Sequence, residues 1–250
     1  MAGPASDRSA DRIILGLPSK GRLRDACFEW FAERGVTVEG TGAEREYAGR
    51  VVGVEGVDLA LLSAGEIPKE LAAGRIHLGV TGEDMVRERI PDADAAVRLL
   101  AAMGFGFADL VIAVPDAWAD VETMADLDAV AGRLRADLGR PLRIATKYHL
   151  LVRRFLRAQG VADCLLVDSQ GATEGAVRQG AAEAIADITT SGATLTDNRL
   201  RPLADGLILK SQAHLCLSNR AALGPARAAR LDALGEALGL GPLASARVPQ

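Results

Sequence analysis

Short apolar runs that alternate with segments of helical periodicity constrain the fold of this chain more than any other feature. Between the runs, apolar residues recur at helical spacing, as they do across residues 23–31. Helices that connect successive strands imply βαβ units and a mostly parallel sheet. Aromatic residues make up only 4% of the chain, so the core must consist mainly of Leu, Val, Ile and Ala, which favours an α/β fold. Residues 203–210 and 213–218 read as two adjacent antiparallel strands. The buried strands are expected at residues 12–17, 57–62, 76–81, 96–102, 109–114, 142–146, 163–167 and 183–188.

The order of these segments indicates two lobes, and a chain of 250 residues suffices for two separate cores. The alternation breaks at residues 103–107, where two glycines lie among aromatic residues, and again near residues 196–200. A cleft between two such lobes is a common place for a ligand. We therefore expect lobe I to combine residues 12–104 and 197–250, and lobe II to comprise residues 105–196.

Charge and cysteine content exclude several classes of protein. The net charge is −4, which gives no general attraction to nucleic acid or to an anionic membrane. No apolar run approaches the ~20 residues of a membrane-spanning helix. Residues 1–11 are polar, lack the apolar core of a secretion signal and are expected to form a disordered tail. Cys27, Cys164 and Cys216 are widely spaced, which argues against a metal site and fits a reducing cytoplasm.

The segment Asp187–Leu195 follows an apolar run and combines an acid, several hydroxyls and a glycine. The carboxylate of Asp187 can accept hydrogen bonds from two ribose hydroxyls. Gly192 permits a sharp turn and a close approach of the backbone to a phosphate. A strand-to-helix turn with a capping hydroxyl is the alternative interpretation. The candidate donors to phosphate are the hydroxyls of Thr190, Ser191 and Thr194 and the backbone N–H of Ala193.

Five motifs, each weak alone, occur in an order that resembles the ATP phosphoribosyltransferase family. The resemblance covers roughly residues 12–218 and ends in the loop described above. The motifs are Leu17-Pro-Ser-Lys-Gly-Arg-Leu23, Gly79-Val-Thr-Gly-Glu-Asp84, Ala145-Thr-Lys-Tyr148 with Arg153-Arg-Phe155, Gly171-Ala-Thr-Glu-Gly175, and Asp187 to Leu195.

This resemblance implies a bilobal fold of the type II periplasmic-binding-protein kind, with a cleft between the lobes. It also implies transfer of the phosphoribosyl group of phosphoribosyl pyrophosphate to N1 of ATP, the first step of histidine biosynthesis. Only residues 220–250 follow Asn219, which is too little for the regulatory domain of the family's long form, so the chain resembles the short form. The short form implies a hetero-oligomer with a regulatory subunit that resembles histidyl-tRNA synthetase.

The implied reaction needs no protein nucleophile, because catalysis can come from positioning and from stabilisation of the leaving pyrophosphate. We expect Lys20 and Asp187 to act in catalysis and Glu174 to lie near the ribose. Mg²⁺ is inferred as a cofactor because pyrophosphate sites commonly use it, with no protein metal ligands assigned. The residues assigned to ATP or pyrophosphate are Lys20, Arg22, Arg45, Thr81, Gly82, Asp84 and Lys147.

The sequence departs from the family pattern at two positions. His149-Leu150 follows Tyr148, where many relatives have Pro-Asn. Ser63 stands close to a position where many relatives carry Arg, and Arg45 or Arg50 could supply the missing charge.

Two other interpretations remain open at this point. One is a cytoplasmic anion-binding or sensor protein of the same bilobal fold, without turnover. The other is a salvage phosphoribosyltransferase, although such enzymes usually carry two adjacent acids and here Ala186 precedes Asp187. Arg153, Arg154 and Arg157 form a basic helix face, which is a solvated surface unless it contacts a partner or a phosphate.

Overall fold

The computed structural model describes residues 11–40, 48–169 and 172–246. The chain divides into two compact units: unit 1 comprises Met1–Gly106 and Gln212–Gln250, and unit 2 comprises Phe107–Ser211. The expected tail, apart from Asp11, and the candidate residue Arg45 lie outside the described residues. No described helix is long and apolar enough to cross a membrane.

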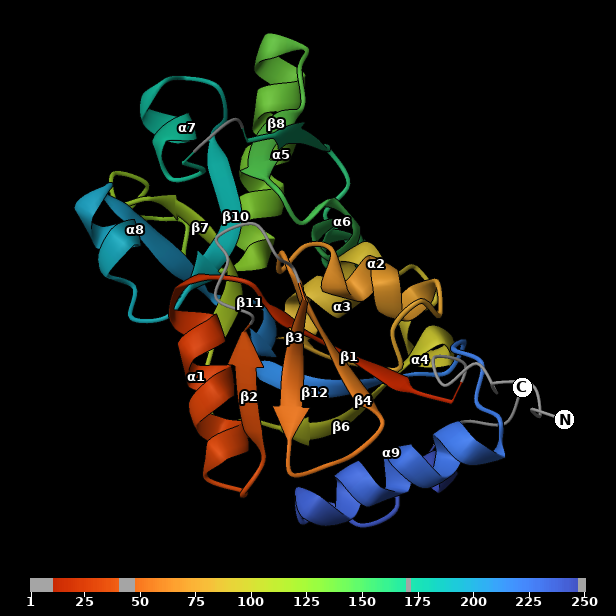
Figure 1. Ribbon diagram of the computed structural model, residues 1–250. Coiled ribbons are helices and arrows are strands. Elements are labelled where there is room, and N and C mark those ends of the chain that lie inside the picture. Colours follow the sequence, from red (N-terminus) through yellow and green to blue (C-terminus); the bar gives the residue numbers. More distant parts are fainter. Residues whose placement is uncertain (1–10, 41–47, 170–171, 247–250) are drawn as a thin grey trace, which may run out of the picture. The chain divides into compact units, whose positions relative to one another are not determined.

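Within the described residues of unit 1, seven strands form one sheet in the order β2-β3-β4-β1-β5-β12-β6 (Figure 1). The central strand β1 pairs in parallel with β4 and β5, so that Leu15 lies beside both Leu59 and Leu78. The strands are β1 (Ile13–Pro18), β2 (Thr37–Gly40), β3 (Ala48–Val52), β4 (Val57–Leu62), β5 (Leu78–Gly82), β6 (Val97–Ala102) and β12 (Ala213–Ser218).

Helices cover both faces of this sheet. On one face Cys27, Trp30 and Phe31 of α1 pack with Leu231 and Leu234 of α9 against β1. On the other face α2, α3 and α4 form a second core cluster. Burial from both sides explains why β1 reads as an almost continuous apolar run. The helical segments are α1 (Gly21–Ala32), α2 (Ile67–Ala72), α3 (Glu83–Arg89), α4 (Ala93–Ala96), α9 (Pro225–Ala237) and the short 3₁₀ turn η1 (Ala244–Ala246).

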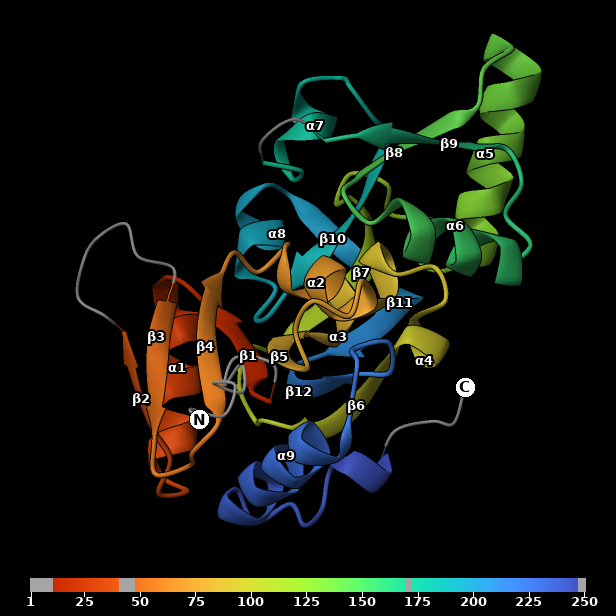
Figure 2. The same ribbon diagram turned by 45° about the vertical axis from the view of Figure 1, so that its right-hand side comes forward.

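Within the described part of unit 2, five strands form a sheet in the order β11-β7-β10-β8-β9. Helices α7 and α8 pack on one face, where Ala176, Ile185 and Leu195 belong to one core cluster. Helices α5 and α6 belong to the opposite face (Figure 2). Right-handed crossovers explain the opposite faces of α6 and α7, because the chain runs from β8 through α6 to β9 and then back past β8 through α7 to β10. The elements are β7 (Ala108–Pro115), α5 (Met124–Leu138), β8 (Leu142–Thr146), α6 (His149–Ala158), β9 (Cys164–Asp168), α7 (Gly175–Arg178), β10 (Ala184–Thr189), α8 (Ala193–Asp197) and β11 (Leu200–Ser211).

The α/β class is confirmed, but the expectation of a mostly parallel sheet is wrong. Among the described strands, β1, β4 and β5 are parallel, as are β10, β8 and β9. The pairs β2–β3, β3–β4, β12–β5, β12–β6, β10–β7 and β11–β7 are antiparallel. Only residues 53–56 separate β3 from β4, which is enough for a hairpin and too few for a parallel crossover.

The expected pairing of residues 203–210 with residues 213–218 is also wrong. β11 pairs with β7 in unit 2, whereas β12 pairs with β5 and β6 in unit 1. Only Gln212 separates the two strands, and the chain passes from one unit to the other between Ser211 and Gln212.

The chain passes between the units at residues 106/107 and 211/212, whereas the sequence indicated 104/105 and 196/197. At the first passage Gly104 and Gly106 have φ values of 77° and 66°, a region that favours glycine. The second passage lies later because β11 pairs along the length of β7, from Leu200 to Ser211.

Candidate functional site

Three parallel strands of unit 2 end at one edge of its sheet. Thr146 of β8 lies beside Ala186 of β10 on one side and beside Asp168 of β9 on the other. The loops that follow these strands therefore begin at the same edge. Ligands of α/β sheets characteristically bind at the carboxyl ends of parallel strands. The candidates Lys147 and Glu174 lie in the loops after β8 and β9, and Asp187 lies in the last part of β10, just past its pairing with β8.

Asp187 is positioned by the end of the β8–β10 pairing. That pairing stops at Ala186, whereas β10 continues along β7, where Asp187 lies beside Val111. Strand alternation places Asp187 on the same face as Ile185, which is the face covered by α7 and α8. The half-buried carboxylate accepts a hydrogen bond of 2.8 Å from the backbone N–H of Ile188. The other carboxylate oxygen has no hydrogen-bond partner among the described residues, so it can accept a hydrogen bond from a ligand.

The turn after β10 is held by its own hydrogen bonds. Gly192 has a φ of 76°, and its N–H donates to the hydroxyl of Thr189 at 2.9 Å. The N–H of Ala193 lies 3.4 Å from the Ser191 hydroxyl oxygen. The side chains of Ser191 and Thr194 are exposed, as the proposed phosphate contacts require. Thr189 was not among the sequence candidates, because it lies between the strand expected at residues 183–188 and the hydroxyls assigned to phosphate.

Thr190 occupies a different position from the other hydroxyls. Its side chain donates a hydrogen bond of 3.0 Å to the backbone carbonyl of Phe107, at the start of unit 2. The hydroxyl proton is therefore engaged within the protein. Thr190 anchors the loop in this arrangement, and its distant partner could not be read from the local sequence.

The loop after β9 carries Glu174 and a buried pair of hydroxyls. Ser169 and Thr173 are buried, and their hydroxyl oxygens lie 2.9 Å apart. Glu174 is half-buried at the residue that precedes α7. Neither Ser169 nor Thr173 was a sequence candidate, although both lie close to the glycine motif that suggested Glu174. Gly171 lies outside the described residues.

In the loop after β8, the adjacent residues Lys147 and Tyr148 differ in exposure. Lys147 is exposed, whereas Tyr148 is buried at 7% exposure and its N–H donates to the Thr146 hydroxyl at 2.9 Å. Nε2 of His149 lies 3.3 Å from Asp168, which connects the start of α6 to the end of β9. Of the first two residues after β8, only Lys147 places its side chain at the surface.

The described candidates of unit 1 lie at the carboxyl ends of β1 and β5, beside the carboxyl end of β4. Lys20 and Arg22 are exposed at the start of α1. Thr81 is fully buried at the end of β5, and its hydroxyl has no hydrogen-bond partner among the described residues. Gly82 precedes α3, and Asp84 is buried in its first turn at 5% exposure. Because these three strands are parallel, the structure brings the cations and the polar α3 start to the same edge of the unit 1 sheet.

The loop after β4 lies at this edge and carries negative rather than positive charge. The N–H of Ser63 donates to the carboxylate of Glu66 at 2.9 Å. Hydrogen bonds from Ser63 lower the pKa of Glu66 below its ordinary value, so the carboxylate is ionised at neutral pH. Residues 63–66 contain no cation, so the charge expected from an arginine near Ser63 is not supplied within this loop.

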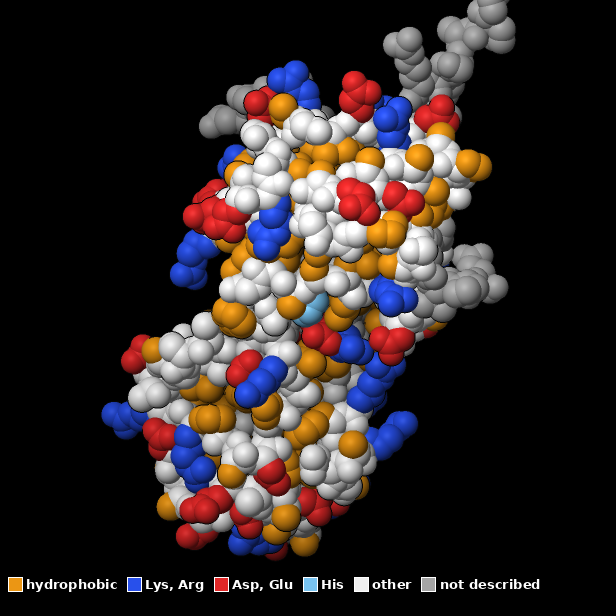
Figure 3. Space-filling model, turned by 90° about the horizontal axis from the view of Figure 1, so that it is seen from below, with side chains coloured by type: hydrophobic (Ala, Val, Ile, Leu, Met, Phe, Trp, Pro, Cys, Tyr) orange, Lys and Arg blue, Asp and Glu red, His pale blue; other side chains and the backbone are white. Residues whose placement is uncertain are grey.

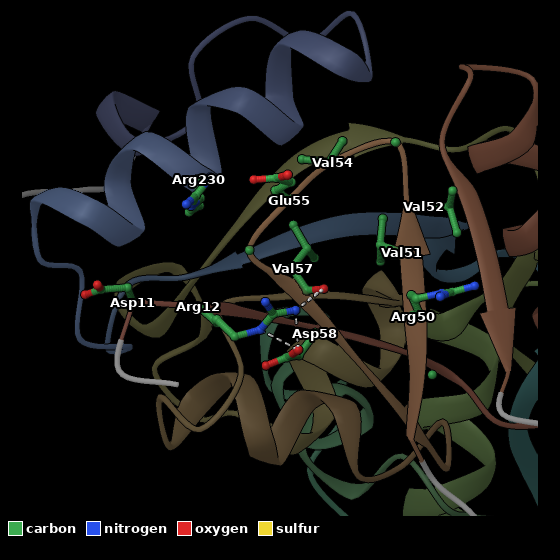
Figure 4. Close-up of a pocket in the computed structure, with 13 residues that line it drawn as sticks. Asp11, Arg12, Arg50, Val51, Val52, Val54, Glu55, Val57, Asp58 and Arg230 are labelled. Atoms are coloured by element: carbon green, nitrogen blue, oxygen red, sulfur yellow. Dashed lines mark hydrogen bonds and ion pairs between the residues drawn. The ribbon is translucent and has the colours of Figure 1, made fainter. Parts of the chain in front are cut away.

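A wide hollow of about 1050 Å³ lies elsewhere in unit 1 (Figure 4). It is lined by the β3–β4 hairpin, by Arg12, whose guanidinium is 2.7 Å from Asp58, and by Arg230 of α9. These residues surround the amino ends of β1 and β4, which is the edge opposite to Lys20 and Thr81. Among the described candidate residues, Arg50 alone lines the hollow, so the hollow is not the predicted substrate site.

Electrostatics and metal-binding groups add two constraints. Cationic and anionic side chains are interspersed on the face that Figure 3 shows, in keeping with the net charge of −4. Across the described residues, no group of three or more His, Cys, Asp or Glu side chains is arranged to hold a metal ion.

Comparison with known proteins assigns the family. The model of the ATP phosphoribosyltransferase family matches residues 63–238. An ATP phosphoribosyltransferase of Cereibacter sphaeroides is 61% identical over 91% of this chain and 96% of its own length. This chain belongs to the ATP phosphoribosyltransferase family. The family match spans the candidate residues of α3 and of unit 2, whereas Lys20, Arg22 and Arg45 precede it.

Relatives of the ATP phosphoribosyltransferase family differ in length. A member from Rhodopseudomonas palustris is 52% identical over 84% of this chain, which spans 64% of that protein. Among solved structures, the ATP phosphoribosyl transferase (HisG:HisZ) complex from Thermotoga maritima contains a chain similar to this one. The two superpose with a TM-score of 0.65 at 21% identity, covering 91% of this chain and 96% of the other, which supports the same fold.

Proposed function

We propose that this member of the ATP phosphoribosyltransferase family binds the phosphoribosyl group of its substrate in the loop Asp187–Thr194. The reaction joins C1 of the ribose of phosphoribosyl pyrophosphate to N1 of ATP and releases pyrophosphate, the first step of histidine biosynthesis. The observation that carries the function is the 61% identity to an ATP phosphoribosyltransferase over 96% of that protein's length. The same chemistry requires a ribose site, a phosphate site and stabilisation of the leaving group.

The ribose and phosphate sites follow from the contacts of this loop. Asp187 has a free acceptor for ribose hydroxyls at the end of β10. Ser191 and Thr194 present exposed hydroxyls, and the N–H groups of Ala193 and Thr194 lie at the start of α8. Gly192 carries no side chain, and apart from its neighbours in the chain no described atom lies within 4 Å of the position that a Cβ would take there, which leaves room for a phosphate oxygen.

Stabilisation of the leaving pyrophosphate is assigned to cations. Lys20 and Arg22 lie at the carboxyl edge of the unit 1 sheet, and Lys147 lies at the carboxyl edge of the unit 2 sheet. Arg45 is a further candidate from the sequence. Negative charge grows on the pyrophosphate as the bond to C1 breaks, so a fixed cation stabilises the transition state more than the ground state. Thr81, Gly82 and Asp84 are proposed to contact ATP.

A divalent metal ion fits this site as a companion of the substrate. Asp187 and Glu174 provide carboxylate oxygens at one edge of unit 2, and the described residues offer no all-protein metal site. Mg²⁺ is usually bound through one or two carboxylates together with substrate phosphates. When bound, Mg²⁺ neutralises part of the pyrophosphate charge, while the protein residues fix the ribose and its phosphate.

We further infer a regulatory partner and a cytoplasmic location. The similar solved structure is described as a HisG:HisZ complex, which supports a hetero-oligomer for this chain as well. The partner is proposed to resemble histidyl-tRNA synthetase. Histidine biosynthesis uses cytoplasmic metabolites, which is consistent with the location proposed from the sequence.

Calorimetry with phosphoribosyl pyrophosphate and Mg²⁺ tests the proposed loop. Asp187→Ala is expected to weaken binding by at least about tenfold, or about 1.4 kcal/mol, and to leave ATP binding unchanged. Asp197→Ala, an exposed acid at the end of α8, is the matched control and is expected to bind as the wild type. Wild-type affinity in a folded Asp187→Ala protein would overturn the site. Pyrophosphate release with ATP, measured with the regulatory subunit present, tests the reaction itself.

A further inference from the structure

The outer edge of β9 is a surface that the proposed reaction does not use. β9 ends the strand order of unit 2 and pairs on one side only, with β8. The N–H of Leu142 donates to the carbonyl of Asp163, and the N–H of Ser169 donates to the carbonyl of Thr146. These two bonds fix which residues of β9 turn their backbone groups toward β8.

Backbone groups alternate along a strand, so Leu165 and Val167 direct theirs to β8 and Leu166 directs its N–H and carbonyl outward. Among the described residues, no other strand lies on this side. The backbone of Leu166 can therefore pair with an added strand without any change to the existing sheet.

β9 lacks the features that usually protect an edge strand. Exposed edges commonly carry Lys, Pro or a bulge that blocks further pairing. The other edge strand of this sheet, β11, includes Pro202 and Lys210, and its pairing with β7 shifts register between Pro202 and Leu209. β9 reads Cys-Leu-Leu-Val-Asp and leaves the side chain of Leu165 49% exposed. The two edges of one sheet thus differ in their readiness to pair.

An apolar hollow of about 440 Å³ adjoins this edge, lined by Leu156, Val161, Leu165 and Leu166. Cys164 also lines it, and burial, with smaller effects from Asp128 and Asp163, raises the pKa of its thiol to about 12. The thiol is consequently neutral at physiological pH and adds to the apolar surface.

The rim of the hollow is positively charged. Arg153 and Arg157 of α6 line it, both are exposed, and neither has an ion pair within the described residues. Two of the neighbouring acids already have partners, since Asp163 lies 3.8 Å from Arg135 and Asp168 lies 3.3 Å from His149. The exposed Asp128 of α5 has no ion pair within the described residues, so two arginines face one unpaired acid here. An excess of positive charge is notable here because the whole chain carries −4.

We propose that the β9 edge binds an extended acidic segment of another protein, which adds to the sheet as a further strand. Its backbone pairs with Leu166, its apolar side chains cover Leu165, and its carboxylates lie beside Arg153 and Arg157. This is recognition by strand addition, in which main-chain bonds give affinity and the side-chain pockets give specificity. A second copy of this chain is disfavoured because a two-fold contact would place the same arginines opposite each other.

Peptide probes test this proposal on the full-length protein. The probe is an acetylated peptide of about six residues that alternates Glu and Val, a usual length for an added strand. Two controls keep its length: one replaces Glu by Lys, and the other is N-methylated at alternate residues and cannot form ladder hydrogen bonds. The Glu peptide is expected to bind saturably, to slow hydrogen exchange of the Leu166 amide and to bind more weakly at high salt.

A pair of arginine variants identifies the binding surface. Arg157→Glu is expected to weaken binding of the Glu peptide by about tenfold. Arg133→Glu changes the net charge equally on the exposed surface of α5 and is expected to have little effect. The proposal is overturned if no peptide binds at about 1 mM, if the Lys or N-methylated peptide binds equally well, or if Arg157→Glu changes nothing. Salt-resistant self-association that Leu166→Pro abolishes would instead assign this edge to a second copy.

Discussion

The hydroxyl of Thr189 shows how a single residue can shape a binding loop without touching a ligand. It accepts the N–H of Gly192 at 2.9 Å, which fixes the turn before α8. Thr189→Val keeps the shape of the side chain and leaves that N–H without its partner. We expect phosphoribosyl pyrophosphate binding to weaken by about 1–2 kcal/mol, since loop order is lost. Calorimetry with Mg²⁺ measures the change.

Thr196→Val is the matched control for this variant. The Thr196 hydroxyl donates to the carbonyl of Gly192, but that carbonyl also accepts the backbone N–H of Thr196. Removing the hydroxyl leaves the carbonyl satisfied, so affinity should stay close to that of the wild type. Equal losses in both variants would show that Thr189 has no special role.

Two exposed threonines of the loop are expected to respond differently to substitution. The hydroxyl of Thr194 has no hydrogen-bond partner among the described residues, whereas that of Thr190 donates to the carbonyl of Phe107. Thr194→Ala should weaken phosphoribosyl pyrophosphate binding by about 1.5–3 kcal/mol, the range for a hydrogen bond to a charged group. Thr190→Ala should weaken binding less than Thr194→Ala, because it removes the hydrogen bond that orders the loop and not a contact with the ligand. Titration of both folded variants decides the assignment, and unchanged affinity in Thr194→Ala would contradict it.

Residue types in the sequence indicated the loop but could not tell engaged groups from free ones. Asp187, Ser191 and Thr194 are placed where a ligand can reach them at the strand end. The contact of Thr190 with Phe107 joins residues that are distant in the chain, so no local pattern reports it.

At the scale of elements, Glu183 connects β8 to the start of β10. Its carboxylate accepts from the Arg143 backbone N–H at 2.8 Å and from the Arg143 guanidinium at 2.6 Å. Burial acts to raise the pKa of Glu183, but the hydrogen bonds from Arg143 and the nearby charges outweigh it, so the pKa is lowered. Because the pKa is lowered, the charged form of Glu183 stabilises the fold at every pH above about 4.3, the ordinary pKa of a glutamate side chain. This stability is lost as the pH falls through the folded-state value.

Glu183→Gln should therefore reduce the free energy of unfolding at pH ~7 by about 1–3 kcal/mol. The difference from the wild type should shrink as the pH falls below about 4.3 and through the lowered folded-state pKa of Glu183, because the wild-type carboxylate then becomes protonated as well. Urea denaturation at pH ~7 and in this acidic range measures the difference in the free energy of unfolding. Glu122→Gln, whose side chain is exposed, serves as the control. A difference that persists unchanged at low pH would attribute the effect to packing instead of charge.

Periodicity predicted the βαβ elements well and the pairing of strands poorly. The run 142–146 and the helix after it are as expected, because local apolar spacing determines them. The neighbours β11 and β12 read as a hairpin, yet they belong to different sheets. Pairing depends on which strand edges are available in three dimensions. β11 pairs with β7, which is a longer strand than β12.

At the scale of the whole molecule, unit 2 is one continuous stretch of chain whose ends lie together. Ala108 near its start lies beside Ser211 at its end, in the pairing of β7 with β11. A continuous stretch with adjacent ends and its own core is the usual description of an independent domain. Two interruptions in the alternation of strands and helices indicated this organisation, but the second one was placed before β11, near residues 196–200.

The position of that second passage has a direct consequence for folding. A fragment of residues 107–211 contains β7, β10, β8, β9 and β11 and should unfold cooperatively in urea, with dispersed amide resonances. A fragment of residues 105–196 lacks β11, which leaves β7 as an unpaired edge and removes Leu200 and Leu203 from the core. It should be disordered or aggregate, because an exposed apolar strand edge recruits other chains. If the shorter fragment folded as well as the longer one, β11 would not be needed for the stability of unit 2, and the boundary near residue 196 would be the better description of this chain.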